Sequence, residues 1–162
     1  MSTLAAALDR LREAGDGGAL CEWIPYARYL GMRFECRDGA SRFTLPYRED
    51  LVGNPALPAL HGGAVAGFME SAALMQVLLE STEPRLPKSI DFSLDYLRSA
   101  RTEDCHAACE LVRQGRRVAA VQIRCWQRDP GKPIATARAH FLLAEVPEST
   151  GMDRQLSANE RE

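Results

Sequence analysis

Two hydrophobic patterns divide the sequence into one helical and several extended segments. Residues 61–79 are almost continuously apolar, with Glu70 near their middle, and this composition and length predict a buried helix. Residues 89–98, SIDFSLDYLR, instead alternate apolar and polar side chains, which is typical of a strand with one buried face. The same alternation, interrupted by turn residues, predicts three more strands, at residues 105–113, 116–127 and 133–145.

The segment before the helix predicts a hairpin and then a loop. Residues 32–47 alternate about Asp38 and Gly39, a pair suited to a tight turn with positive backbone angles. Residues 48–60 are rich in Pro, Gly and Asn, which predicts an ordered loop. The expected order is a hairpin, the long helix and four strands arranged as a meander. An antiparallel sheet buries one apolar helix best by curling around it, so the expected fold class is α+β.

The chain before the hairpin is expected to be a helical lead-in, residues 1–30. Residues 3–14 have the spacing of an amphipathic helix, and residues 20–30 predict a second short helix or turn. The second segment carries Tyr26 and Tyr29. We expect these aromatic rings to pack on a sheet edge or to cover a pocket.

Length and composition indicate a single domain with no strong charge bias. The 162 residues, 46% of them hydrophobic, are enough for one core, which is expected at residues 31–146. The tail, residues 147–162, has few apolar side chains, which predicts disorder. Twenty basic and 22 acidic residues give a net charge of -2, so nothing favours nucleic-acid or membrane-surface binding. Five cysteines without a CxxC pair, and no leader-like segment before Ala5, predict reduced thiols and a cytoplasmic location.

Two local features suggest other functions, but their neighbours disfavour both. Cys105 and Cys109 flank His106, yet on a strand the two thiols share one face and the imidazole points to the other, so we expect no metal and no cofactor. Residues 61–79 are about long enough to span a bilayer, but Glu70 lies near their centre and no basic flank adjoins them. A buried helix of a soluble protein is the better interpretation.

A carboxylate within an apolar helix is a candidate for chemistry. Burying an ionised Glu70 costs several kcal/mol unless it is paired, so the alternatives are a hydrogen-bonded core or interface residue and a functional one. His61, Gly62 and Gly63 begin the helix, where free backbone N–H groups can bind an oxyanion. His61 and Glu70 are nine residues apart, on opposite faces and about 13 Å along the axis. A twofold dimer with antiparallel helices would bring Gly63 of one subunit to Glu70 of the other.

Three sequence features occur together: the loop GNPALPALHGG, the acid nine residues after its histidine, and the strand SIDFSLDYLRSA. In these features the chain resembles the PaaI-like acyl-CoA thioesterases of the hotdog fold, and the resemblance covers roughly residues 24–146. It implies an antiparallel five- to six-stranded sheet wrapped around a long central helix, subunits paired through their sheets, and an acyl-CoA substrate. Glu70 falls at the catalytic Asp or Glu of the family and Gly63 at the N–H that polarises the carbonyl. His61 falls at the loop-supporting histidine, and Asn54 falls near a polar Asn or Gln.

Hydrolysis of a thioester needs a positioned water, a base and oxyanion donors. We therefore expect Glu70 either to deprotonate water or to attack the carbonyl itself, with the Gly63 N–H of the partner subunit as oxyanion donor. Arginine suits the phosphates of coenzyme A, and Arg98 is the first candidate. The substrate-binding residues are expected to be Gly62, Leu60, Phe68, Leu74 and Arg98.

Two other functions remain open from the sequence. The first is a non-catalytic hotdog module that binds acyl-CoA without turnover. The second is a hotdog enoyl-CoA hydratase or dehydratase, which would pair an acid with a histidine across the dimer. In each case the expected assembly is a homodimer, with a dimer of dimers (a homotetramer) as the larger possibility.

Overall fold

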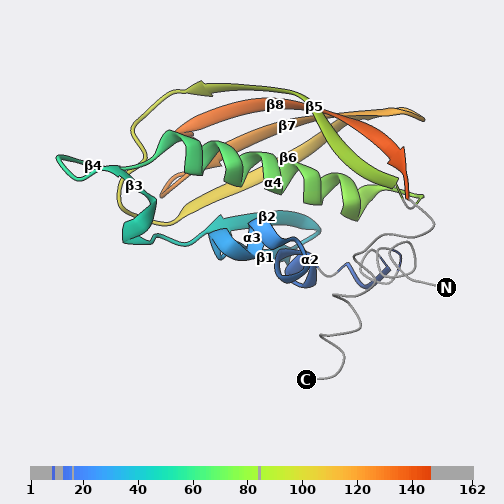
Figure 1. Cartoon of the computed structure of the whole chain (residues 1–162), viewed down its shortest axis with the longest axis horizontal. Helices are drawn as coiled ribbons and strands as arrows, with labels where there is room; N and C mark the ends of the chain where they lie inside the picture. The colour runs from blue at the N-terminus through green and yellow to red at the C-terminus, as the bar shows by residue number, and fades with distance from the viewer. Residues whose placement is uncertain (1–8, 10–12, 16, 84, 147–162) are drawn as a thin grey trace.

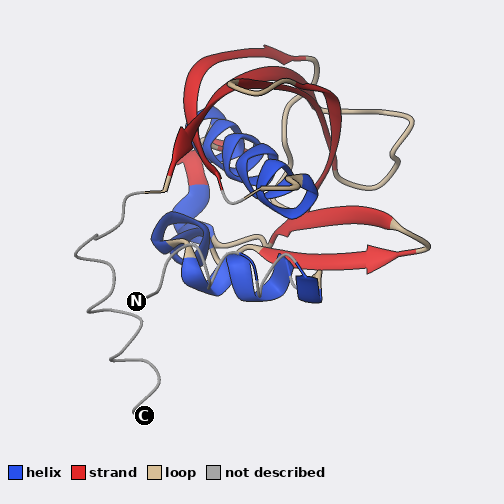
Figure 2. Cartoon of the chain, turned by 90° about the vertical axis from the view of Figure 1, so that its right-hand side faces the viewer, coloured by secondary structure: helices blue, strands red, loops and turns tan. Residues whose placement is uncertain are grey.

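The computed structural model describes residues 9, 13–15, 17–83 and 85–146. Most of the predicted first helix and the whole predicted tail lie outside these residues. Within them, one antiparallel sheet wraps around one long helix, which confirms the α+β hotdog prediction (Figures 1 and 2). The helices are α2 (Gly17–Trp23), α3 (Pro25–Leu30), the short 3-10 helix η1 (Glu49–Leu51) and α4 (Gly62–Glu80). The strands are β1 (Arg33–Arg37), β2 (Ala40–Leu45), β3 (Val52–Asn54), β4 (Leu57–Leu60), β5 (Arg85–Tyr96), β6 (Cys105–Gln114), β7 (Val118–Trp126) and β8 (Ala135–Glu145).

The predicted meander of four strands is wrong in one respect. The sheet order is β1-β2-β6-β7-β8-β5, so β5 lies beyond β8 at the sheet edge and does not neighbour β6. Its pairing runs from Arg85 opposite Glu145 to Tyr96 opposite Ala135. The physical reason is α4, which crosses the concave face of the sheet and delivers the chain to the edge opposite the β1–β2 hairpin (Figure 1).

Two predicted connections had different outcomes. The turn between β1 and β2 is confirmed, because Asp38 and Gly39 have φ angles of 52° and 77°. The predicted loop at residues 48–60 instead contains η1 and a small hairpin, β3–β4, which forms a separate two-stranded sheet. The Leu60 N–H donates to Ala100 O at 2.9 Å, so β4 is also tied to the connection between β5 and β6. This tie fixes the point at which α4 begins.

The core lies between α4 and the concave face of the sheet. Val65, Phe68, Ala72 and Met75 follow helical spacing and are fully or almost fully buried. The sheet meets them with small side chains, which let the helix approach closely: Ala107, Ala119, Ala137 and Ala139. Burial of a side chain as large as Phe68 stabilises a fold by about 1.5–3 kcal/mol, so this contact holds α4 in place.

Among the described residues, α4 is the one helix long and apolar enough to cross a membrane. More than half of its most apolar window is buried inside the fold, as in the core helix of a soluble protein. Its opposite face carries Gly63, Ala66, Gly67, Glu70 and Leu74, of which none is fully buried.

Candidate active site

The start of α4 is held by His61. This residue has an extended backbone, and its Nδ1 accepts a hydrogen bond of 2.9 Å from the Gly63 N–H, so it caps the helix. Its own N–H donates to Leu51 O at 2.8 Å, which ties the cap to η1. A Cβ on Gly53 would lie 2.9 Å from His61 Cδ2, so β3 packs directly against the imidazole. Acceptance at Nδ1 requires the neutral ring with its proton on Nε2.

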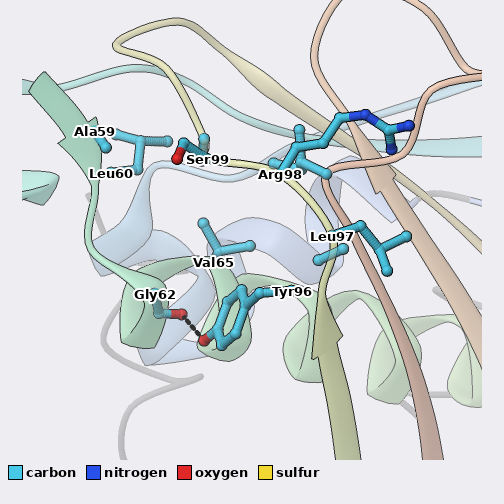
Figure 3. A pocket seen from close by; sticks show the side chains of 11 residues that line it. Ala59, Leu60, Gly62, Val65, Tyr96, Leu97, Arg98 and Ser99 are labelled. Atoms are coloured by element: carbon cyan, nitrogen blue, oxygen red, sulfur yellow. Dashed lines mark hydrogen bonds between the residues drawn. The ribbon is translucent and has the colours of Figure 1, made fainter.

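A pocket of about 420 Å³ lies beside this helix start, between α4 and the end of β5. The Tyr96 hydroxyl donates to Gly62 O at 2.6 Å and forms one wall (Figure 3). The pocket is lined by Ala59, Leu60, Gly62, Val65, Tyr96, Leu97, Arg98, Ser99, Ala100, Ile134 and Ala135. Three of these, Leu60, Gly62 and Arg98, are among the expected substrate-binding residues.

The Arg98 side chain extends away from Gly62 toward the rim of the pocket (Figure 3). Its Nη1 donates to Pro133 O at 2.6 Å, which fixes it on the connection that precedes β8. The guanidinium remains exposed to solvent. This position presents a charged donor at the pocket mouth.

Glu70 is half-buried on the open face of α4, not enclosed in the core, so the expected cost of a buried charge does not arise within one protomer. No hydrogen bond or ion pair involves its carboxylate within the part of the chain that the structure describes. Glu70 is seven positions after Gly63, which places them on the same helix face about 10 Å apart along the axis. One protomer therefore does not bring the two groups to a common atom.

The other expected site residues take structural positions. Phe68 is 0% exposed and lies in the core, so it does not line the pocket. Leu74 is partly buried and packs against the core. The Asn54 side chain accepts a 2.9 Å hydrogen bond from the Ala56 N–H and stabilises the β3–β4 turn.

The histidine and one cysteine of β6 have shifted pKa values that follow from burial. The described residues include no group of three His, Cys, Asp or Glu side chains that could hold a metal ion. His106 Nδ1 lies 3.0 Å from Thr44 Oγ1, and burial lowers the pKa of the imidazole. Burial raises the pKa of the Cys109 thiol well above its usual range, so this sulfur is a protonated thiol and a poor nucleophile.

Comparison with known proteins decides the family. The family model of the acyl-CoA thioesterase N-terminal domain matches residues 53–142, which include Gly63 and Glu70. The chain belongs to this family. It is therefore a thioester hydrolase by descent, as the resemblance in the sequence implied. The lead-in helices α2 and α3 precede the matched segment.

Individual relatives agree with this assignment. The medium/long-chain acyl-CoA thioesterase YigI of Escherichia coli strain K12 is 30% identical over 135 residues, which cover 74% of this chain and 86% of the relative. A crystal structure of a Chromobacterium violaceum protein is 40% identical and covers 88% of this chain and 99% of its own, with a TM-score of 0.69. A Bacillus halodurans protein solved with CoA is 19% identical and shares the fold, with a TM-score of 0.67 over 85% of this chain and 94% of that one.

The sequence did not indicate that Tyr96 and Ser99 lie beside the helix start. Alternation along SIDFSLDYLR placed Tyr96 on the same face as apolar residues but did not show which element it contacts. The signal available was the polar tip of an otherwise apolar aromatic residue, because a tyrosine hydroxyl that packs against the protein usually has a hydrogen-bond acceptor. Here that acceptor is Gly62 O.

Proposed function

We propose that the protein hydrolyses acyl-CoA to a free acid and CoA at two sites shared across a homodimer. Glu70 of one subunit acts as general base toward water, or as nucleophile. The Gly63 N–H of the partner subunit binds the oxyanion. The observation that supports this most is the carboxylate of Glu70, unpaired among the described residues and half-exposed on the helix face that also carries Gly63.

A small side chain between these two groups suits a twofold axis. Ala66 lies between Gly63 and Glu70 along the helix, and its methyl group is too small to hold another helix away. Two α4 helices crossing there in opposite directions would place each Gly63 beside the other Glu70. β5 is an edge strand of 12 residues, so sheet-to-sheet pairing has a free strand to use.

The His61 cap has a consequence for this mechanism. The Gly63 N–H already donates to His61 Nδ1 in the protomer. As an oxyanion donor, it must exchange this hydrogen bond for one to the thioester oxygen, or share it between the two acceptors, as the substrate binds. We assign His61 to this holding role and not to proton transfer. No metal or cofactor is needed, because a thioester carbonyl is electrophilic and its thiolate leaves readily.

The substrate assignment follows from the pocket and from the relatives. The apolar residues Leu60, Val65 and Ile134 favour an alkyl chain, and Arg98 at the rim favours a phosphate of CoA. The YigI relatives are named for medium/long-chain acyl-CoA, and we propose the same class here. We expect the working enzyme to be a soluble cytoplasmic homodimer or dimer of dimers.

The test is thiol release from acyl-CoA of increasing chain length by wild type, Glu70→Gln and the control Glu83→Gln. Glu83 is an exposed carboxylate paired with Arg85 and lies outside the site. We expect Glu70→Gln to lower kcat at least 100-fold, a typical contribution of a general base, with no effect of Glu83→Gln. If wild type releases thiol from no acyl-CoA, or Glu70→Gln is as fast as wild type, the proposal fails. An active monomer in light scattering would contradict the shared site.

A further inference from the structure

The lead-in helix α3 presents one tyrosine to the open face of α4. In Figures 1 and 2, α3 lies below α4, beside the β1–β2 hairpin. A Cβ on Gly67 would lie 2.6 Å from the Tyr26 hydroxyl oxygen and 3.0 Å from its Cε1. The phenol tip therefore occupies space that any other residue at position 67 would fill. The absence of a side chain at Gly67 is what admits the ring.

Tyr26 is held in this position by its neighbours. Its ring stacks on that of Tyr29, with centroids 6.1 Å apart and 20° between the planes. The Arg48 guanidinium lies 5.7 Å from the centre of the Tyr29 ring, and its Nη1 donates to Tyr29 O at 2.7 Å. Arg48 is in turn paired with Asp50 at 3.0 Å. Although Tyr26 is 48% exposed, its ring is supported on one side by this chain of contacts.

The Tyr26 hydroxyl lies beside the part of α4 that carries Glu70. Gly67 and Glu70 are three residues apart on one helix, so they are surface neighbours. A side chain on an α-helix leans toward the N-terminus and covers the turn before its own Cα. A glutamate at position 70 is therefore long enough to cover the turn that contains Gly67, where the Tyr26 hydroxyl lies. That hydroxyl has no hydrogen-bond partner among the residues that the structure describes.

We propose that Tyr26 is a positioning residue for Glu70. In the assembled dimer its hydroxyl donates a hydrogen bond to the carboxylate, a bond that the single protomer does not contain, and holds it over the open face of α4, directed at the partner's helix start. The inference rests on the proposed function, in which the Glu70 carboxylate is the general base or the nucleophile. It extends the site to α3, a segment before the part of the chain that the family model matches.

The experiment compares kcat and KM of wild type, Tyr26→Phe and Tyr47→Phe, and repeats Tyr26→Phe in a Glu70→Asp background. Tyr26→Phe removes only the hydroxyl, and Tyr47→Phe removes a different, partly exposed hydroxyl. We expect Tyr26→Phe to lower kcat about tenfold, the usual effect of losing a hydrogen bond to a charged group, with KM and melting temperature unchanged. Tyr47→Phe should match wild type.

The double variant separates positioning from structure. Aspartate is one methylene shorter than glutamate and does not reach back to the hydroxyl, so Tyr26→Phe should then change kcat less than twofold. A wild-type kcat in Tyr26→Phe, or the same tenfold loss in both backgrounds, would overturn the inference and leave the thioesterase proposal intact. Absence of thiol release by wild type would overturn both.

Discussion

Replacement of His61 by alanine distinguishes two roles that a histidine can have in an active site, namely capping a helix and transferring a proton. Within the described residues the imidazole makes one hydrogen bond, which its Nδ1 accepts from the Gly63 N–H at 2.9 Å and which caps α4. Loss of an N-cap side chain costs about 0.5–2 kcal/mol, and the exposure of His61 to solvent favours a value of about 1 kcal/mol. For a protein of this size, that loss corresponds to a fall in melting temperature of about 2–4 °C.

The two readouts for His61→Ala are thermal unfolding and thiol release. Because the variant frees the Gly63 N–H and removes no proton-transfer group, kcat should stay within about fivefold of wild type. His61→Asn is the matched control, since asparagine is a strong N-cap and should restore the melting temperature. A 100-fold loss of kcat at an unchanged melting temperature would refute the holding role and indicate that His61 transfers a proton.

Two further predictions concern the helix face and the β6 histidine. Gly67→Ala should raise the free energy of unfolding by up to about 1 kcal/mol, because alanine has the higher helix propensity. It should also lower kcat, because the new methyl group displaces the Tyr26 hydroxyl. A variant that is both more stable and fully active would contradict this. Burial lowers the pKa of His106 in the folded state, so the unfolded state binds the proton more readily. The contribution of neutral His106 to the free energy of unfolding is present above about pH 6.5 and is lost as the pH falls through the folded-state pKa. The denaturant midpoint of His106→Gln should therefore change less between pH 7 and pH 5 than the midpoint of wild type. An unchanged pH profile in that variant would show that other groups dominate.

The local elements of this protein follow from its sequence because their signals are local. The long helix was predicted at 61–79 and runs from Gly62 to Glu80, and the turn at Asp38 and Gly39 needs only the conformations that those residues favour. The strand predicted at residues 89–98 begins earlier, at Arg85, because β5 continues through Pro87, which an edge strand tolerates.

The arrangement of the elements in space was harder to predict from the sequence than the elements themselves. Alternation shows which residues share a face but not which strand lies beside which, so the placement of β5 next to β8 needed the structure. The same limit applies to the site. The sequence indicated Glu70, Gly63 and His61 through their order along one helix, whereas the contacts that Tyr26 and Tyr96 make with that helix join segments that are distant in the chain.

The strand order also affects how the chain folds during synthesis. β2 pairs with β6 in the sheet, and all of α4 lies between these two strands in the sequence. This pairing therefore cannot form until β6 has left the ribosome. α4 is complete at Glu80, while the last strand that covers it ends at Glu145. At usual rates of translation, α4 therefore remains without strands β5–β8 for on the order of several seconds after its own synthesis. During that interval the nascent chain exposes an apolar segment, which makes it prone to aggregation until β5–β8 have been synthesised.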